Sequence, residues 1–426
     1  MKPEATAGAS TGGAQTEAAV VSSSPTTAIG PSVLLVDPSL FTGPYDAALN
    51  DGLVKAGVRP RWATRPTRPG DRDEIPRDYV DDYFYRGVDT AQFLPGPLRA
   101  LAKGLSHMVG LLRLMTSVHR QRPDVVHLQW LALPPLDVMA LAWIRRRAAI
   151  VLTMHDTVPF NGSHKTLLQR IGIWRGVALA DAVIVHTQSG RERLARLGVP
   201  EHKLEVIAHG PLALRVPPPA PRAHRDTRAC FVAFGEIKPY KGLDLLIEAL
   251  AALPEAQRAQ CRAIVAGRPQ MDLEPLRQRI AALGLEHTIE LRPRRQTEEE
   301  MAVLFDDADA FVFPYRQIDA SGVYFLVKNR ERWLIASRLG IFREDMRDGV
   351  DGRLIEPESV AALRDALADF VAQRPRPGPP AASNSWDSIG RATRQLYESV
   401  LARRAARHVQ ASDRAAATGA KGSLGR

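Results

Sequence analysis

The sequence contains little cysteine and few aromatic residues. Two of its 426 residues are cysteines, and Phe, Trp and Tyr together make up 6%. Cys230 and Cys261 are too few for a disulfide framework and lack the spacing of a zinc site. Residues 1–30 have no basic start followed by an apolar run, so they predict a disordered lead and no signal peptide. These absences favour a protein of the reducing cytoplasm.

Long uninterrupted apolar stretches are also missing. Residues 125–144 have the length of a membrane span, but His127, Gln129 and Pro134 interrupt them. Polar groups and unpaired backbone are costly in lipid. We therefore expect a strand, a turn and a core helix in this stretch, and no membrane span.

Short apolar runs alternate with longer helical patterns, which predicts a parallel α/β architecture. Two proline-rich stretches, 215–228 and 374–380, interrupt the alternation because proline continues neither a helix nor a sheet. The expected organisation is a first Rossmann-like domain over 31–215, a linker over 216–228, a second Rossmann-like domain over 229–380, a final helix over 386–408 and a disordered tail over 409–426.

Loops that follow strands are the places to look for ligand-binding residues, because open α/β sheets bind ligands at the carboxyl ends of their strands. After the expected strand 230–234, Gly235 allows close backbone approach, and Lys238 and Lys241 add positive charge beside a helix start. This combination suits a phosphate group. A solvated turn with surface lysines is the alternative for this loop taken alone.

The loop after the expected strand 310–313 carries Asp319, Ser321 and Gly322 ahead of another helix. Ser321 is a good N-cap, so this helix start predicts a second anion-binding position facing the first. Asp319 is the best-placed carboxylate of this half. Capping of the helix by both side chains is the plain alternative.

Polar side chains next to an aromatic ring follow two strands of the first half. His127, Gln129 and Trp130 lie around the end of one strand, and His155 and Asp156 follow the next. Groups that hydrogen-bond to hydroxyls beside an aromatic face are typical of a site for a sugar or another small polar ligand.

Residues 234–244 (FGEIKPYKGLD) resemble the phosphate loop of the retaining GT-B glycosyltransferases of family 4, or group 1. Residues 313–357 resemble the donor-sugar segment of that family. Its N-terminal landmarks are matched by residues 126–130, 153–156 and 207–210. The resemblance runs in order over 32–408. It implies the GT-B architecture, in which two Rossmann-like domains face each other across a cleft and the last helix, 386–408, packs back on the first domain.

The resemblance also implies roles for single residues. Lys241 matches the lysine that binds the donor diphosphate, whereas the family arginine five residues earlier falls on Glu236, so Lys238 would supply the second charge. Of the Glu-x7-Glu motif, Asp319 replaces the first glutamate, which contacts the donor sugar. Val327 cannot replace the second glutamate, which usually holds the nucleotide ribose.

Three sets of site residues follow from the resemblance and the loops. Catalytic roles are expected for Asp319, Lys241 and His127. Donor binding is expected for Gly235, Lys238, Lys241, Ser321, Gly322 and Glu344. Acceptor binding is expected for Gly43, Gln129, His155 and Asp156.

The activity implied is that of a retaining glycosyltransferase of the hexosyltransferase type (EC 2.4). It would move a sugar from a nucleoside-diphosphate donor to a glycan or lipid-linked acceptor in surface polysaccharide biosynthesis. Fixed cations and helix starts would stabilise the leaving diphosphate. Residues 307–309 spell a metal-binding DxD motif but precede a strand instead of following one, so we expect no metal and no other cofactor.

Two alternatives stay open because of Glu236 and Val327. One is a glycosyltransferase-like binding subunit with weak or no turnover, and the other is a GT-B nucleotide-sugar epimerase. A dinucleotide oxidoreductase is disfavoured, since residues 37–46 contain only Gly43 where a Gly-rich turn is needed. The net charge of +10 could suit a nucleic-acid binder, but the sequence does not interleave basic and aromatic residues as such proteins do.

Residues 97–122 carry apolar side chains at helical spacing, five basic residues and no acidic one. We favour an ordinary core-facing helix with a solvated basic side. The alternative is a basic amphipathic helix that contacts anionic lipid at the inner face of the plasma membrane. A cytoplasmic protein is expected in either case.

Overall fold

The computed structural model describes residues 30–68, 73–87, 95–157, 167–217, 219, 226–328, 330–379 and 384–422. The disordered lead expected over 1–30 lies outside the described residues except for its last position. So does much of the expected linker over 216–228.

In the described residues, the N-terminal domain has a parallel sheet of seven strands in the order β3-β2-β1-β4-β5-β6-β7. Its strands are β1 (Ser32–Asp37), β2 (Arg59–Thr64), β3 (Val80–Asp82), β4 (Val125–Leu128), β5 (Ala149–Met154), β6 (Ala182–Val185) and β7 (Leu204–Val206). Its helices are α1 (Gly43–Lys55), α2 (Gly96–Gln121), α3 (Pro134–Ile144), α4 (Leu167–Leu179) and α5 (Gln188–Arg196), with short 3-10 helices η1 (Arg77–Tyr79) and η2 (Glu201–Lys203).

The C-terminal domain has a parallel sheet of six described strands in the order β10-β9-β8-β11-β12-β13. Its strands are β8 (Ala229–Phe234), β9 (Cys261–Ala266), β10 (Ile289–Arg292), β11 (Ala310–Phe313), β12 (Trp333–Ser337) and β13 (Gly352–Ile355). Its helices are η3 (Pro239–Lys241), α6 (Leu243–Ala251), α7 (Glu255–Arg258), α8 (Glu274–Ala282), α9 (Glu298–Asp307), α10 (Gly322–Val327), α11 (Gly340–Asp345) and α12 (Val360–Gln373).

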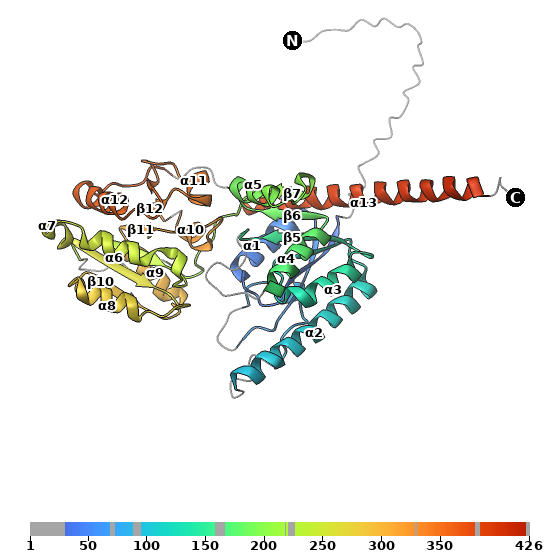
Figure 1. Ribbon diagram of the computed structural model, residues 1–426, viewed down its shortest axis with the longest axis horizontal. Coiled ribbons are helices and arrows are strands. Elements are labelled where there is room, and N and C mark those ends of the chain that lie inside the picture. Colours follow the sequence, from blue (N-terminus) through green and yellow to red (C-terminus); the bar gives the residue numbers. More distant parts are fainter. Residues whose placement is uncertain are drawn as a thin grey trace, which may run out of the picture.

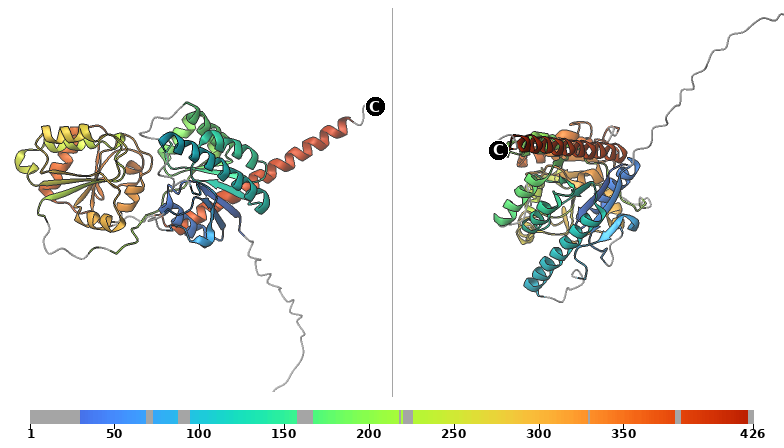
Figure 2. Two further views of the ribbon diagram at one scale, coloured as in Figure 1. Left: turned by 90° about the horizontal axis from the view of Figure 1, so that it is seen from below. Right: turned by 90° about the vertical axis from the view of Figure 1, so that its right-hand side faces the viewer.

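Helices cover both faces of each sheet, which explains why the strands are apolar on both sides. In the N-terminal domain, α1 and the last helix α13 (Trp386–Gly422) pack on one face, and α2 to α5 pack on the other. In the C-terminal domain, α6, α8 and α12 cover one face, and α9, α10 and α11 cover the other. Figures 1 and 2 show the two domains side by side, with α13 running along the N-terminal one.

The contact between α1 and α13 depends on two glycines. A Cβ on Gly390 would lie 2.0 Å from the carbonyl oxygen of Gly52, so neither helix could carry a larger residue there without moving. Nearby, Arg394 Nη1 donates to the Ala56 carbonyl oxygen at 2.6 Å. These contacts tie the end of the chain to the N-terminal domain.

The predicted α/β class with two parallel sheets is confirmed, but several elements differ from expectation. Strands β2, β3, β7 and β13 were not predicted from the sequence. The helix expected over 386–408 continues to Gly422, so residues 409–422 are helical where we expected a disordered tail. Residues 423–426 lie outside the described part of the chain.

Candidate active site

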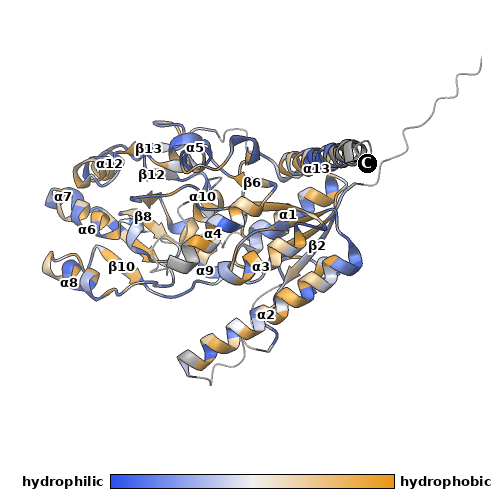
Figure 3. Ribbon diagram, turned by 45° about the vertical axis from the view of Figure 1, so that its right-hand side comes forward, coloured by the Kyte–Doolittle hydropathy of each residue, from blue (hydrophilic) through white to orange (hydrophobic). Residues whose placement is uncertain are grey.

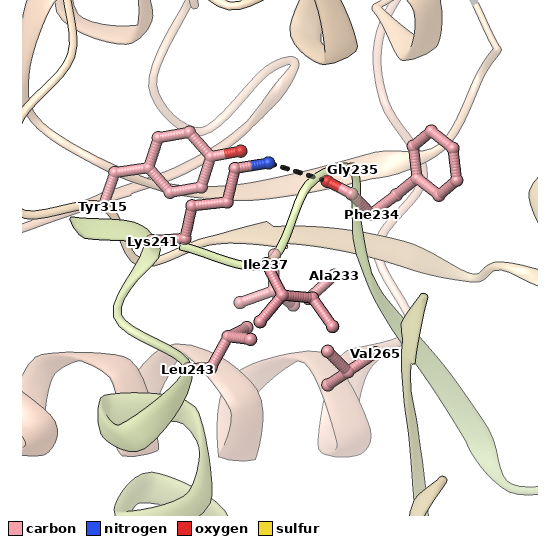
Figure 4. A pocket seen from close by; sticks show the side chains of 9 residues that line it. Ala233, Phe234, Gly235, Ile237, Lys241, Leu243, Val265 and Tyr315 are labelled. Carbon is pink, nitrogen blue, oxygen red and sulfur yellow. Dashed lines mark hydrogen bonds between the residues drawn. The ribbon is translucent and has the colours of Figure 1, made fainter. Parts of the chain in front are cut away.

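The loop after β8 brings Lys241 back over Gly235. Gly235 has a φ of +103°, and a Cβ at this position would lie 2.7 Å from Lys241 Nζ. The same Nζ donates to the Phe234 carbonyl oxygen at 3.3 Å and lies 5.4 Å from the centre of the Tyr315 ring. Figure 4 shows the ammonium between Tyr315 and the Phe234–Gly235 turn, beside a small cavity with apolar side chains such as Ile237.

Lys241 is a buried cation, with 7% of its surface exposed. Burial, and then the charge of Lys238, lower the pKa of Lys241 from 10.5 to about 7, while Glu236 acts in the opposite direction. An anion beside the ammonium would favour its charged form. Lys241 is therefore suited to holding a negatively charged group that enters next to Gly235.

Lys238, expected to supply a second positive charge, forms an ion pair with Glu236, the residue at the position of the family arginine. Lys238 Nζ lies 3.0 Å from one carboxylate oxygen of Glu236, and Arg268 Nη2 lies 2.6 Å from the other. Burial opposes ionisation of Glu236, but hydrogen bonds from Arg268 and Lys238 hold its pKa below 4.5. Arg268 follows β9, and it places a guanidinium beside Glu236, the position where the resemblance leads one to expect an arginine.

Asp319 lies at the contact between the two domains and is 3% exposed. Its Oδ2 accepts a hydrogen bond from the backbone N of Thr157 at 2.6 Å, and a second from the Thr157 hydroxyl. Its Oδ1 lies 3.2 Å from Nη1 of Arg193 on α5. The carboxylate thus joins the loop after β11 to the loop after β5 of the other domain.

Several buried polar atoms near these strand ends have no hydrogen-bond partner among the described residues. Asp319 Oδ1 and Arg193 Nη1 form an ion pair, yet neither atom makes a hydrogen bond with good geometry. Gln129 Nε2, after β4, and Ser337 Oγ, at the end of β12, are likewise buried and unbonded. Buried polar groups are normally satisfied, so these four atoms are exceptions among the described residues.

Ser321 and Gly322 begin a helix that is shorter than expected. Ser321 Oγ accepts a long hydrogen bond from the Tyr324 backbone N at 3.4 Å, which makes it the N-cap of α10. Because α10 spans only six residues, its dipole is small, and the second anion-binding helix start stays a prediction. Val327, at the last position of α10, is fully buried in the core and cannot reach a ribose.

Glu344, expected to bind the donor, contacts the N-terminal domain in the structure. Its two carboxylate oxygens accept hydrogen bonds from the backbone N atoms of Ser189 and Gln188, each at 2.8 Å. These residues form the first turn of α5 in the N-terminal domain, where a carboxylate is favoured by the helix dipole. Glu344 is therefore a contact between the domains, and its donor-binding role stays a prediction.

His127 is a core residue, and its predicted catalytic role is corrected. It is fully buried within β4. Its Nδ1 pairs with the hydroxyl of Tyr397 on α13 and its Nε2 with the Thr153 hydroxyl, both at 2.7 Å. With both ring nitrogens occupied inside the domain, His127 cannot contact a substrate. Burial, and then His186, lower the pKa of His127 to about 3, so the ring is neutral.

The expected acceptor residues Gln129 and His155 lie together at the strand ends. His155 Nε2 lies 3.2 Å from Gln129 Oε1, its Nδ1 lies 3.2 Å from His186 Nε2, and its ring stacks on Trp130. Burial, and then neighbouring histidines led by His186, hold the pKa of His155 well below 6.5. Both ring nitrogens of this neutral imidazole thus have partners within the domain, although the residue is partly exposed.

The other two expected acceptor residues lie at different places. Asp156 comes close to Tyr240 of the other domain. Its charge, after burial, contributes to raising the pKa of Tyr240 to about 12. Gly43 begins α1 and is packed inside the domain, since a Cβ there would lie 2.9 Å from the Glu74 side chain. It therefore has a packing role.

Sequence reasoning assigned no site role to Thr157, Arg193 or Arg268. Thr157 directly follows the His155-Asp156 pair, so its place after a strand was a readable signal. Arg268 follows Gly267 directly after β9, so its place after a strand was a readable signal too. Arg193 carries no such signal, because it lies within α5 and meets Asp319 only through the arrangement of the two domains.

Comparisons with known sequences agree with this geometry. The chain matches the family described as Glycosyltransferase Family 4 over residues 47–210, and the family described as Glycosyl transferases group 1 over residues 219–380. A D-inositol 3-phosphate glycosyltransferase of Streptomyces coelicolor is 27% identical over 368 residues, covering 76% of this chain and 78% of the relative. A GDP-mannose-dependent alpha-(1-6)-phosphatidylinositol monomannoside mannosyltransferase of Mycolicibacterium smegmatis is 30% identical over 223 residues, covering 49% and 56%.

Solved structures share the fold at low sequence identity. Anabaena Alr3699/HepE, in complex with UDP and glucose, has a TM-score of 0.60 at 16% identity and covers 89% of this chain and 100% of its own. The catalytic domain of starch synthase IV from Arabidopsis thaliana, bound to ADP and acarbose, has a TM-score of 0.61 at 12% identity and covers 88% and 99%. The predicted GT-B architecture is confirmed. The two family matches span both domains in order, and the chain belongs to the group 1, family 4 glycosyltransferases.

Proposed function

We propose that this nucleotide-sugar glycosyltransferase holds the diphosphate of its donor at Lys241 and the donor sugar at the contact between the domains. The proposal is carried by two features observed together. The buried Lys241, over Gly235, has its pKa lowered to about 7, and Asp319 Oδ1 and Arg193 Nη1 have no hydrogen-bond partner. A diphosphate would supply the missing counter-charge. Sugar hydroxyls would supply the missing hydrogen bonds.

Lys241 acts mainly as the group that receives developing charge. When the bond between the sugar C1 and the diphosphate oxygen breaks, negative charge grows on the leaving oxygen, and a fixed cation stabilises it without reorganising. Arg268 and Lys238 add two further cations, whose charge Glu236 partly offsets. On donor binding, the diphosphate competes with Glu236 for both. We propose that no metal ion is needed for this charge stabilisation.

Asp319 and Arg193 orient the sugar. A hydroxyl of the sugar donates to Asp319 Oδ1 and accepts from Arg193 Nη1, the two atoms that lack hydrogen-bond partners. Positive charge that develops at the sugar C1 is also favoured by the Asp319 carboxylate. Because the carboxylate bonds to Thr157 as well, this position depends on the two domains being in contact.

We propose retention of the anomeric configuration. The oxygen of the acceptor hydroxyl attacks the sugar C1 from the face that the diphosphate leaves. The bond between C1 and the diphosphate oxygen breaks, and the hydroxyl proton passes to that departing oxygen. Gln129 Nε2, which lacks a partner in the structure, donates to a hydroxyl group of the substrate, and His155 holds the Gln129 side chain in place through its Oε1. Since the pKa of His155 is held well below 6.5, the ring serves as a neutral hydrogen-bonding group in this step.

We propose a lipid-linked or glycan acceptor and a role in building a surface polysaccharide. The support is indirect: the name of the Mycolicibacterium relative describes transfer to a phosphatidylinositol mannoside, and that of the Streptomyces relative describes transfer to inositol 3-phosphate. Both acceptors carry a polyol and a phosphate group.

The donor is identified by thermal-shift screening of the full chain with UDP, GDP and ADP and their common sugar conjugates. One nucleotide series should raise the melting temperature, because a ligand that binds only the folded protein stabilises it. Retention is then read from the anomer of the product by NMR. An inverted product overturns the retaining mechanism, and conversion of the donor without any acceptor indicates an epimerase.

A further inference from the structure

Tyr315 follows β11 at the carboxyl end of the C-terminal sheet, and contacts with three other rings hold its ring. The ring centre lies 5.6 Å from that of Tyr240, 5.7 Å from that of Phe313 and 5.5 Å from that of Phe342, all in edge-to-face arrangements. Such contacts favour one orientation of an aromatic ring. The residue is also buried, with 2% of its surface exposed. The hydroxyl of Tyr315 therefore has a fixed position.

That hydroxyl is buried and makes no hydrogen bond of normal geometry with any described residue. The Ser321 hydroxyl lies close enough to influence it. Burial, and then Tyr240, raise the pKa of Tyr315 above 10, and Ser321 acts in the opposite direction. A buried hydroxyl without a hydrogen bond costs free energy, so few are found in folded proteins. The Tyr315 hydroxyl is thus free to donate to a group that enters beside it.

The hydroxyl lies next to the cation of the proposed diphosphate site. Lys241 Nζ is 5.4 Å from the centre of the Tyr315 ring, and Figure 4 shows the hydroxyl directed toward the end of the Lys241 side chain. Both residues line the small cavity after β8, together with apolar side chains such as Val265 and Val312. Strand β8 itself is hydrophobic along its length, as Figure 3 shows. The ammonium and the hydroxyl are therefore neighbouring polar groups at the place where an apolar strand ends.

We propose that Tyr315 is a further donor-binding residue, whose hydroxyl donates a hydrogen bond to an oxygen of the diphosphate that Lys241 holds. The inference rests on the proposed diphosphate site and adds a neutral donor to it. Hydrogen bonds to an ionised acceptor are shorter and stronger than those between neutral groups, so a phosphate oxygen suits this hydroxyl. The same bond remains as negative charge grows on the leaving diphosphate.

Tyr315 and Lys241 differ in how their contributions depend on pH. Lys241, which is influenced by Lys238 and Glu236, loses its charge above about pH 7. The raised pKa of Tyr315 keeps its hydroxyl protonated well above that pH. A direct hydrogen bond from Tyr315 should therefore contribute equally at pH 6.5 and pH 8.5, whereas a hydroxyl that acted through the charge of Lys241 would lose its effect at the higher pH.

The test is calorimetric titration of the full chain and of Tyr315→Phe with inorganic pyrophosphate and with UDP, GDP and ADP. Phenylalanine keeps the ring and its contact with Lys241 and removes only the hydroxyl. The variant should bind pyrophosphate, and the nucleotide that the unmodified protein binds best, about tenfold more weakly at both pH 6.5 and pH 8.5. The affinities are compared between the two proteins at the same pH, so the titration of the ligand itself cancels.

Two further measurements separate binding from a structural role. The melting temperature of Tyr315→Phe without ligand should equal or exceed that of the unmodified protein, because a buried hydroxyl without a partner has been removed. The matched control is Tyr79→Phe. Tyr79 is partly buried on η1 of the N-terminal domain, and its substitution should leave the affinity for pyrophosphate unchanged.

Three results would overturn the role of Tyr315 and leave the diphosphate site at Lys241 intact. The first is equal affinity in Tyr315→Phe and the unmodified protein. The second is a loss of affinity at pH 6.5 that disappears at pH 8.5, and the third is a loss that comes with a lower melting temperature. If the unmodified protein binds neither pyrophosphate nor any of the three nucleotides, the proposed function itself fails, and the role of Tyr315 with it.

Discussion

Asp319 Oδ2 accepts a hydrogen bond from the backbone N of Thr157 at 2.6 Å, and this bond crosses from one domain to the other. The carboxylate is also 3.2 Å from Arg193 on α5. Glu344 makes another carboxylate contact between the domains, with the first turn of α5. The two carboxylates thus share one structural role, but only Asp319 keeps a buried oxygen without a hydrogen-bond partner.

This difference predicts different effects for two matched substitutions. Asp319→Asn should lower kcat/KM about 100-fold (~3 kcal/mol), because it removes both the ion pair with Arg193 and the charge that faces the sugar. Glu344→Gln should change kcat/KM only a few-fold, since it alters the domain contact alone. Steady-state kinetics of both variants makes the comparison. Equal losses would mean that Asp319 acts only by joining the domains.

The ion pairs of Glu236 with Lys238 and Arg268 predict that removing its charge increases the affinity for nucleoside diphosphate. Glu236→Gln should tighten the binding of nucleoside diphosphate about threefold at low salt, because it frees Lys238 and Arg268 to pair with the ligand. The gain should shrink at high salt, where exposed charges are screened. Glu248→Gln is the control, because Glu248 pairs with Arg279 on the outer side of the domain. Isothermal titration calorimetry that finds weaker binding in Glu236→Gln would contradict this role.

The pKa of Lys241 near 7 predicts that donor affinity falls as the pH rises. With a pKa of about 7 in the folded protein, Lys241 is mostly charged below this pH and mostly neutral above it. A diphosphate binds the charged form, so the dissociation constant should rise by up to about tenfold per pH unit above 7. Calorimetry at pH 7, 8 and 9 tests this, and binding should take up a proton. A dissociation constant that is flat over this range would contradict it.

Buried neutral histidines predict a loss of stability in mild acid. Burial is the main cause that lowers the pKa of His127 and His209 to about 3 and that of His186 to about 4. The unfolded chain binds these protons near pH 6.5, so the free energy of unfolding should fall as the pH drops from about 6.5 toward 4. Each ring costs about 2 kcal/mol at pH 5.

Urea unfolding at pH 7, 6 and 5 measures this slope. His127→Gln should reduce the pH dependence of the free energy of unfolding by the contribution of one histidine. His202→Gln should leave that pH dependence unchanged, because His202 is exposed. An equal free energy of unfolding at pH 7 and pH 5 would contradict the neutral histidine cluster.

Much of the fold could be predicted because long apolar strands alternate with helices over most of the chain. Strands such as β3 and β7 were missed because they are three residues long and lie at the sheet edges, where the apolar signal is weak. For α2, the sequence revealed the amphipathic pattern but not which of two apolar sides is buried. That choice is made by His107 and Gly110, through partners on other elements.

The candidate site could be predicted where residues are close in sequence. Gly235 and Lys241 lie in one loop, and their contact follows from the turn between them. Asp319 and Thr157 are 162 residues apart and on different domains, so no local pattern fixes their contact. His127 was misjudged because it lies within a strand, where its side chain points into a helix layer, and not in the loop that follows.

The central claim is that Lys241 holds the diphosphate of the donor. Calorimetric titration of the nucleoside diphosphate found by screening, into the unmodified protein and Lys241→Met at pH 6.5, tests it most directly. The variant should bind about 100-fold more weakly (~3 kcal/mol). Its melting temperature without ligand should be equal or higher, because a buried charge with a lowered pKa has been removed. Unchanged affinity and full turnover in Lys241→Met would contradict the claim.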